Sequence, residues 1–377
     1  MRRSLLPLCL LLAIFAFASL ASAQVTTDPV GFTTTSLLSN SDTLVSIPFT
    51  RPAEFTGAIS SVAGNVITVS GTPGWTSNQF VYNGTTQHNH YYALIGTSSS
   101  ADPKEGHTYA VTANSATTLT VDTTNDSLTG IPASTQVILI PNWTLGTVFP
   151  SNADGVSFTS TTQTRTFKTQ VLIPNYSVVG INQAFSTVYF FSNNVNGSSS
   201  NVGWRTVGDN TTPHDDDPLL PDGYLVVRNL NNAPTLPLTA LGGVLTKKLA
   251  VPLVTQGSQA QDNSVSMVRP LDVSLNNSGL NPTDGSFVAT TLTRSFKDQL
   301  LVFNNGLATL NKSPSAVYFY SNNVNGSTNN VGWRLVGDNT TDHGPDLIPA
   351  GSAIIIRKAA NGTASPATVF WTNAPTY

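Results

Sequence analysis

Cysteine, glutamate and charge are all scarce in this chain of 377 residues. It has one Cys, its only two Glu are Glu54 and Glu105, and 10% of its residues are charged, against about 25% in an average soluble domain. A chain so poor in Glu, Lys and Arg is a poor candidate for long helices, which disfavours both an α/β enzyme fold and a coiled coil. A net charge of −3 excludes a basic nucleic-acid-binding protein.

Small polar residues and β-formers are abundant instead. The chain has 51 Thr, 39 Ser and 34 Asn, while 40% of its residues are hydrophobic and 27 are Phe or Tyr. That much apolar and aromatic surface is incompatible with disorder. The composition predicts an all-β protein with little helix.

Residues 1–23 have the pattern of a signal peptide. Arg2 and Arg3 precede an apolar run over residues 5–20, and Ala21-Ser22-Ala23 supplies the small residues that a signal peptidase recognises, so we expect the mature chain to begin at Gln24. A retained membrane anchor is the alternative, but the run is short for a membrane span. Cys9 lies inside this leader, so the mature chain has no cysteine, which favours a bacterial exported protein. No later segment reaches transmembrane length.

The C-terminal two-thirds contains an internal duplication. Residues 189–212 and 318–341 are identical at 20 of 24 positions, with a constant offset of 129. The match extends to residues 164–168 and 293–297, and to His214 and His343. A period this long exceeds that of a solenoid repeat, so it indicates two homologous units of the same topology, either as tandem domains or as one domain built from two pseudo-equivalent halves.

The N-terminal third shows a different pattern, with short strands separated by turn residues. Residues 58–62 and 66–69 flank a Gly-Asn turn, and residues 109–112 and 118–121 flank another short polar turn. We predict a small antiparallel β-barrel or sandwich here. The expected division is a signal peptide (1–23), an N-terminal β domain (24–150), and two homologous β-sandwich-like units (151–250 and 251–377).

Several distinctive strings carry a family resemblance. They are Ser41–Pro48 (SDTLVSIP), Asn78–Tyr82 (NQFVY), Lys104–Gly106 (KEG) and the repeated Gly-Trp-Arg…Gly-Asp-Asn block. In these strings the chain resembles a paralogous family of exported proteins from verrucomicrobial bacteria, over nearly all of its mature length. The resemblance implies export and several paralogues, and it carries over no active site and no ligand.

The repeated block supplies a candidate ligand-binding face. In one interpretation it is a β-hairpin with an Asn-Gly turn, followed by a strand with Trp204 in the core and Arg205 outside. In the other, each tryptophan stacks on a sugar ring while neighbouring amides bind its hydroxyl groups. The candidate residues of this second interpretation are Asn194, Asn196, Trp204 and Arg205 in the first unit, and Asn323, Asn325, Trp333 and Arg334 in the second.

Acidic loops follow each repeated block and supply a candidate metal site. The first contains Asp209, Asn210, His214, Asp215, Asp216, Asp217 and Asp222, and the second contains Asp338, Asn339, Asp342, His343 and Asp346. Oxygen-rich loops suit Ca²⁺, for which the candidate ligands are Asp209, Asn210, Asp215, Asp338, Asn339 and Asp342. The spacing is not that of an EF-hand. A solvated loop with local Asx turns is the alternative, and zinc is disfavoured because each loop has one His and no Cys.

Other chemistry has little support in the sequence. His88-Asn89-His90 places two imidazoles on one face of a strand, with His107 as a third candidate ligand, but a polar loop explains the pattern equally well. There is no Gly-x-Ser-x-Gly motif, no mature cysteine and no pair of neighbouring glutamates.

The sequence therefore predicts an exported, non-enzymatic structural or adhesive protein of the bacterial envelope or extracellular space. The first alternative is a module that binds extracellular polysaccharide through the duplicated Trp-bearing hairpins, and the second is a secreted hydrolase whose site the sequence does not reveal. An extracellular polysaccharide or an envelope protein is the expected partner, and nucleic acid is not.

Overall fold

The computed structural model describes residues 29–198, 200–292, 295–327 and 330–377. The predicted signal peptide lies outside these residues. The expected all-β architecture is confirmed, because the described chain folds into strands and has only one short α-helix, α2 (Leu145–Val148). None of the described helices has the length and apolar character needed to cross a membrane.

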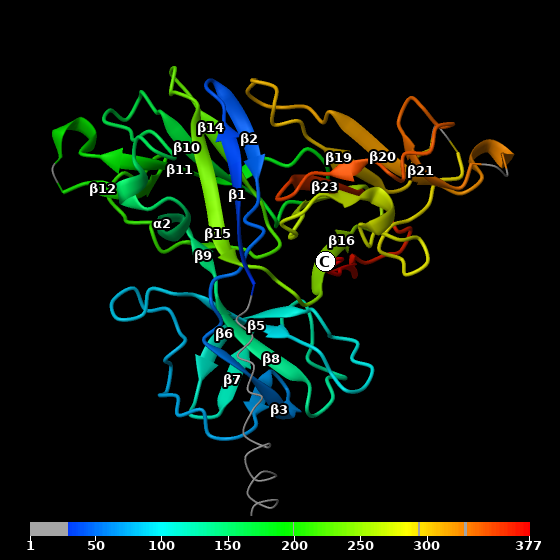
Figure 1. The fold of residues 1–377 in the computed structure, drawn as a ribbon, viewed down its shortest axis with the longest axis horizontal. Coiled ribbons are helices and arrows are strands. Elements are labelled where there is room, and N and C mark those ends of the chain that lie inside the picture. Colours follow the sequence, from blue (N-terminus) through cyan, green and yellow to red (C-terminus); the bar gives the residue numbers. More distant parts are fainter. Residues whose placement is uncertain (1–28, 199, 293–294, 328–329) are drawn as a thin grey trace, which may run out of the picture.

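Six strands form a closed barrel at one end of the molecule (Figure 1). In chain order they are β3 (Phe55–Ala63), β4 (Val66–Val69), β5 (Tyr91–Ile95), β6 (Thr108–Asn114), β7 (Thr118–Val121) and β8 (Gln136–Pro141). The predicted turn between β3 and β4 is present, and Gly64 has the positive φ of 59° that it requires. Inward-facing apolar residues of alternate positions, together with Trp75 and Phe80, fill the barrel.

The first repeat unit is built from segments on both sides of the barrel in sequence. Its five-stranded sheet has the order β12-β11-β10-β14-β2, and two strand pairs, β1–β15 and β9–β13, lie outside that sheet. The strands are β1 (Val30–Leu37), β2 (Ser41–Val45), β9 (Trp143–Thr144), β10 (Thr169–Pro174), β11 (Phe185–Asn193), β12 (Val202–Thr206), β13 (Pro218–Leu219), β14 (Leu225–Asn229) and β15 (Leu236–Gly243). Two 3₁₀ turns, Ser151–Ala153 and Val195–Gly197, complete the unit.

The second repeat unit has the same connectivity. Its sheet order is β17-β23-β19-β20-β21, with the outer pairs β16–β24 and β18–β22. The strands are β16 (Leu249–Thr255), β17 (Gln261–Ser266), β18 (Val273–Ser274), β19 (Gln299–Val302), β20 (Ala316–Ser321), β21 (Gly332–Leu335), β22 (Leu347–Ile348), β23 (Ala353–Lys358) and β24 (Ala367–Asn373). Its 3₁₀ turns are Leu275–Asn277 and Val324–Gly326.

Matching the two units strand by strand shows that the barrel is an insertion. β1 and β2 of the first unit correspond to β16 and β17 of the second, and the barrel occupies the connection from β2 to β9. In the second unit only residues 267–272 connect the equivalent strands β17 and β18. The N-terminal segment 30–45 therefore pairs with the first unit, and the strands of the barrel span only residues 55–141 of the 24–150 range assigned from sequence.

The two units hold each other through equivalent contacts. In the first, Arg228 forms an ion pair with Asp42 at 2.7 Å and also donates a hydrogen bond to the side chain of Asn311 in the second unit. In the second, Arg357 forms an ion pair with Asp262 at 2.7 Å and also donates a hydrogen bond to the side chain of Asn182 in the first unit. Asn182 and Asn311 occupy equivalent loops, 129 residues apart. This reciprocity is that of a pseudo-twofold axis.

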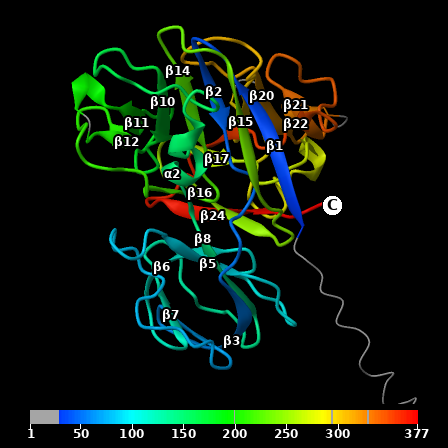
Figure 2. The ribbon, with the colours of Figure 1, turned by 60° about the vertical axis from the view of Figure 1, so that its left-hand side comes forward.

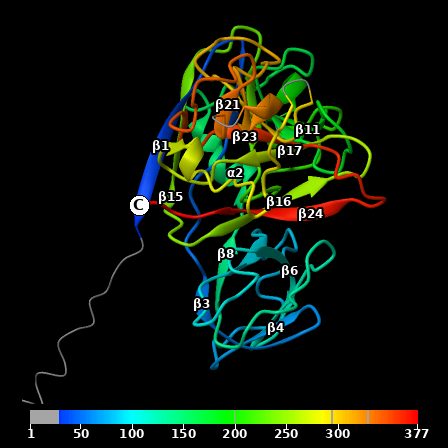
Figure 3. The same ribbon diagram turned by 90° about the vertical axis from the view of Figure 1, so that its right-hand side faces the viewer.

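The barrel breaks this symmetry because it docks under both units. Figures 2 and 3 show β24 and β16 lying directly above the barrel. The backbone carbonyl of Gly106 accepts a hydrogen bond from the amide of Ala250 at 2.9 Å, and Glu105 pairs with Lys248 at 2.8 Å. A Cβ atom at Gly106 would lie 3.0 Å from the Ala250 nitrogen, so glycine permits this close approach.

Candidate functional site

The two repeated tryptophans lie in the hydrophobic cores of their units. Trp204 and Trp333 are 0% and 1% exposed. The Trp204 indole donates to the carbonyl of Phe149 at 3.0 Å and packs against the Phe158 and Phe191 rings. Neither ring can stack on a ligand in this arrangement, because strand alternation turns both toward the core. The hairpin interpretation of the repeated block therefore describes these positions.

The hairpin interpretation is wrong in placing Arg205 outside, because Arg205 and Arg334 are also buried, at 4% exposed each. Arg205 Nη1 donates to the Trp204 carbonyl at 2.8 Å, and Arg334 Nη1 donates to the Trp333 carbonyl at 2.7 Å. Each arginine side chain therefore bonds a backbone carbonyl at the edge of its own strand. In both units this edge is further covered by the acidic loop, whose His backbone amide donates to the carbonyl of the tryptophan at 3.0 Å.

The candidate asparagines shape the hairpin turns. Asn194, Asn196, Asn323 and Asn325 all have left-handed backbone conformations, with φ between 53° and 55°. Asparagine tolerates this region better than most residues. The amides of Asn196 and Asn325 also donate to the carbonyls of Thr162 and Thr291 at 3.0 and 2.9 Å. These residues thus have local structural contacts in each unit.

The acidic loops form compact turns. The carboxylate of Asp209 accepts hydrogen bonds from Thr212 and Thr211, and these hold the pKa of Asp209 below its usual range. Thr341 and Thr340 lower the pKa of Asp338 in the same way. The oxygen atoms that calcium would need are engaged in these turns.

The remaining predicted calcium ligands do not converge with Asp209 and Asp338 into one ligand set. Asp215 accepts from the Trp204 amide at 3.2 Å, Asp342 accepts from the Gly344 amide at 3.0 Å, and Asn210 and Asn339 lie half-buried in the same loops. Over the described ranges no group of three or more His, Cys, Asp or Glu side chains is placed to hold a metal ion. Calcium binding stays a prediction.

The barrel histidines lie at its contacts with the repeat units. His88 Nδ1 lies 2.6 Å from Asp216 of the first acidic loop, which raises the pKa of His88. His107 packs against Phe370 of the second unit, with ring centroids 4.0 Å apart. The His88-Asn89-His90 segment and the acidic loop, predicted separately, therefore meet at the junction between the barrel and the first unit.

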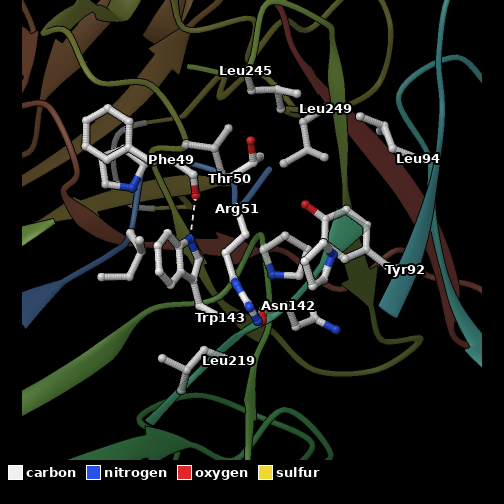
Figure 4. A pocket seen from close by; sticks show the side chains of 15 residues that line it. Phe49, Thr50, Arg51, Tyr92, Leu94, Asn142, Trp143, Leu219, Leu245 and Leu249 are labelled. Atoms are coloured by element: carbon white, nitrogen blue, oxygen red, sulfur yellow. Dashed lines mark hydrogen bonds between the residues drawn. The ribbon is translucent and has the colours of Figure 1, made fainter. Parts of the chain in front are cut away.

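A small apolar pocket lies where the barrel joins both units (Figure 4). Trp143 Nε1 donates to the carbonyl of Phe49 at 2.8 Å, and Arg51 donates to the Asn89 side chain and the Asn142 carbonyl. The pocket encloses about 20 Å³, enough for about one water molecule. It is a packing junction rather than a ligand site.

A much larger cleft lies between the barrel and the two units. Its volume of about 680 Å³ falls within the range of small-ligand sites. All three parts of the molecule line it: Thr108, Tyr109, Ala110, Asp122, Asn125 and Asp126 from the barrel, Tyr176–Val179, Gln183, Leu220, Asp222 and Gly223 from the first unit, and Ala250, Pro252, Val254, Gln256, Gln261–Val265, Thr368 and Phe370 from the second.

The lining of this cleft is acidic and amide-rich. It includes four aspartates, five Asn or Gln side chains and three aromatic rings, with no Lys or Arg among the described lining residues. An anionic ligand would meet like charge there without a compensating cation, which is unfavourable. The lining therefore favours a neutral, polyhydroxylated ligand with apolar ring faces.

Asp222 is the one cleft carboxylate without a partner residue in the described chain. Burial raises the pKa of Asp222, and the only hydrogen bond that opposes this effect comes from its own backbone amide. Asp222 lines the cleft together with Tyr176, and its charge helps to raise the pKa of the Tyr176 hydroxyl. A ligand hydroxyl that donates a hydrogen bond to the Asp222 carboxylate would offset the free-energy cost of removing this carboxylate from water.

Asp126 is held in a network on the barrel side. Its carboxylate pairs with Lys104, and accepts hydrogen bonds from His107 Nδ1 and the Tyr109 hydroxyl at 2.6 Å each. Burial alone would raise its pKa, but these donors hold the pKa of Asp126 below its usual value. At His107 the contact with Asp126 favours a higher pKa, but burial has the larger effect and lowers the pKa of His107. The network positions Tyr109 at the cleft wall.

The other two carboxylates are also engaged. Asp262 forms a two-pronged pair with Arg357, at 2.7 and 3.0 Å, and accepts from the Asn182 amide at 2.7 Å. Asp122 accepts from the amide and hydroxyl of Thr124, which lowers the pKa of Asp122. Asp222 is therefore the carboxylate most available to a ligand.

The cleft residues were not predicted as a site from sequence. From sequence, Asp222 belongs to the first acidic segment, and the other lining residues come from segments spread between 108 and 370. The alignment of the two units places Tyr176 opposite Asn305, but this signal is weak because only Asn175 and Asn182 keep their identity across residues 174–183 and 303–312.

Comparison of the chain with protein-family models, with curated proteins and with solved structures finds no match.

Proposed function

We propose that this chain is an exported, non-enzymatic adhesive or structural protein of the bacterial envelope or extracellular space, and that it holds a neutral polysaccharide in the cleft between the barrel and the two repeat units. The leader pattern and the cysteine-free mature chain support export. The cleft, rather than the buried tryptophans, is the proposed binding surface.

The lining of the cleft is the observation that carries this proposal. Tyr176, which is 42% exposed, and the half-buried Phe370 offer apolar ring surface, and Asn125 and Gln256 contribute amide groups. The side-chain amides of Gln183, Gln261 and Asn263 are bonded within the chain. Neutral sugars present the complementary combination of apolar ring faces and hydroxyl groups. The four aspartates and the missing cation disfavour uronic-acid or sulfated polymers.

A binding role fits the carboxylates better than hydrolysis does. Glycoside hydrolysis ordinarily requires two carboxyl groups, one as acid and one as base or nucleophile. Asp126 and Asp262 are engaged in ion pairs and Asp122 in a local turn, so only Asp222 is available in the described cleft. A single available carboxylate suits the binding of a hydroxyl group.

Affinity gel electrophoresis tests this function. Neutral polysaccharides such as β-glucans and mannans are expected to retard the protein, and alginate is not. Asp222→Ala should weaken the interaction by about tenfold to a hundredfold, the range for a hydrogen bond to a charged group. Glu54→Ala is the matched control, because Glu54 is an exposed carboxylate outside the cleft, and it should behave like the wild type.

Two results would contradict the proposal. One is the absence of retardation by every neutral polymer tested, which would leave only a structural role. The other is equal retardation of wild type and Asp222→Ala, which would place the binding surface elsewhere.

A further inference from the structure

Strand β2 of the first unit binds the second unit through its backbone. Asp42, Leu44 and Ser46 turn their backbone groups away from β14, toward the second unit. The amides of Asp42 and Ser46 donate to the carbonyls of Thr309 and Gly351 at 2.9 and 3.0 Å. Every second residue of this edge strand therefore bonds across the pseudo-twofold interface, as strand geometry requires.

The middle residue of the three binds a side-chain amide. The Leu44 amide donates to Asn305 Oδ1 at 3.0 Å, and Asn305 Nδ2 donates back to the Leu44 carbonyl at 2.7 Å. One carboxamide thus satisfies both main-chain groups of Leu44. The backbone amide and carbonyl of Leu44 can therefore be satisfied by one group that carries a hydrogen-bond acceptor and a donor close together.

Strand β17 of the second unit repeats the outer two contacts. The Asp262 amide donates to the Gly180 carbonyl at 3.0 Å, and the Ser266 amide donates to the Asp222 carbonyl at 2.9 Å. Because β17 pairs with β23 without a register shift, Ser264 also turns its amide and carbonyl away from β23.

The middle contact is missing in this half. No residue of the described chain bonds the backbone amide or carbonyl of Ser264, although the residue is only 7% exposed and lines the cleft. The reason is a substitution between the units: Tyr176 stands where the second unit has Asn305. Its hydroxyl donates instead to the Tyr224 carbonyl at 3.2 Å.

We propose that the backbone amide and carbonyl of Ser264 bind two neighbouring hydroxyl groups of a sugar ring, one as acceptor and the other as donor. This inference rests on the proposed function and names the part of the polysaccharide that the cleft recognises. A vicinal diol presents the donor and the acceptor that Asn305 presents to Leu44. Buried backbone groups are nearly always paired, so a ligand in the cleft would satisfy a pair that no described residue bonds.

Linkage chemistry gives a sharp test of this proposal. Internal residues of a β-1,4-linked glucan have free hydroxyls at neighbouring carbons 2 and 3, whereas internal residues of a β-1,3-linked glucan have no such pair. We expect the β-1,4-linked hexasaccharide to bind at least tenfold more tightly than the β-1,3-linked hexasaccharide, measured by calorimetry. We also expect it to slow hydrogen exchange of the Ser264 amide, measured by NMR on the full mature chain.

Tyr176→Asn is the informative variant, because it installs the residue that satisfies Leu44 in the other half. It should slow exchange of the Ser264 amide without ligand and reduce hexasaccharide affinity at least tenfold. Tyr176→Ala is the matched control. It removes the same ring without supplying an amide, so Ser264 exchange should stay fast.

The outcomes separate this inference from the proposed function. If a neutral hexasaccharide binds without changing Ser264 exchange, the Ser264 assignment is wrong and the function stands. If neither saccharide binds but acetamide, which mimics the Asn305 side chain, slows Ser264 exchange, the backbone pair is a binding group and the polysaccharide function is wrong. Slow Ser264 exchange in the ligand-free wild type would overturn the inference without any variant.

Discussion

A buried ion pair in the second unit replaces a neutral pair in the first. Asp298 and Lys358 are each 1% exposed and form a direct contact, and Lys358 Nζ also donates to the Ser286 carbonyl at 2.8 Å. At the equivalent positions, 129 residues earlier, the Thr169 hydroxyl donates to Asn229 Oδ1 at 2.8 Å. The Thr169–Asn229 pair of the first unit therefore shows which neutral residues can replace Asp298 and Lys358 in this fold.

The single substitutions Lys358→Asn and Asp298→Thr should each be strongly destabilising. Each leaves one buried charge without its partner, which costs about 3–5 kcal/mol. With an m-value of about 2 kcal/mol per molar urea, the unfolding midpoint of the second unit should fall by about 1.5–2.5 M. Fluorescence can report this unfolding, because Trp333 and Trp371 are buried in that unit.

The double variant Asp298→Thr plus Lys358→Asn should recover most of the loss. In the first unit the Thr169 hydroxyl accepts from the Thr159 amide at 2.9 Å, as Asp298 accepts from Val288 at 2.7 Å, so threonine can keep that bond. The bond from the Ala359 amide to Asp298 is lost, which costs about 1 kcal/mol.

The double-mutant cycle decides the argument. We expect a coupling energy of several kcal/mol, with the double variant more stable than either single variant. Losses that simply add, or single variants that each lose less than about 1 kcal/mol, would refute the reasoning that the buried charges are the source of the effect.

Two further predictions follow from the interface and the cleft. Asn182→Gly and Asn311→Gly each keep the positive φ but remove one hydrogen bond to the arginine of the other unit, so their losses should agree within about 0.5 kcal/mol by urea unfolding; a large difference would contradict the pseudo-twofold equivalence. The pKa of Asp222 is raised in the folded protein, so its contribution to stability is full below the unfolded value of about 3.9 and is lost as the pH rises through the folded pKa. Asp222→Asn should therefore raise the melting temperature more at pH 7 than at pH 3.5, and equal gains at the two pH values would count against this.

Composition and repetition were enough to predict the fold class. Scarce Glu, Lys and Arg and dense β-formers predicted strands, and turn residues predicted hairpins such as β3–β4, because these preferences act between near neighbours. The offset of 129 predicted two related units, and the structure places Trp204 and Trp333 in equivalent strands. Dense identity is hard to sustain on two different folds.

The extent of the first unit could not be predicted in the same way. Residues 41–48 and 261–268 share only an Asp, a Val and a Ser in register, and their offset is 220 because the barrel is inserted between β2 and β9. So short a match at a different offset carries little signal. Sheet pairing joined β2 to β14 across 180 residues of chain.

Only the tertiary structure decided where a ligand can bind. The alternation of a strand permits Trp204 to face either the core or solvent, and packing of the unit turned it inward. The cleft exists because three parts of the chain meet, and its lining residues are far apart in sequence. The backbone pair of Ser264 is open for the same reason: a strand edge is paired or free according to which distant loop packs against it, and there the loop carries Tyr176 rather than an asparagine.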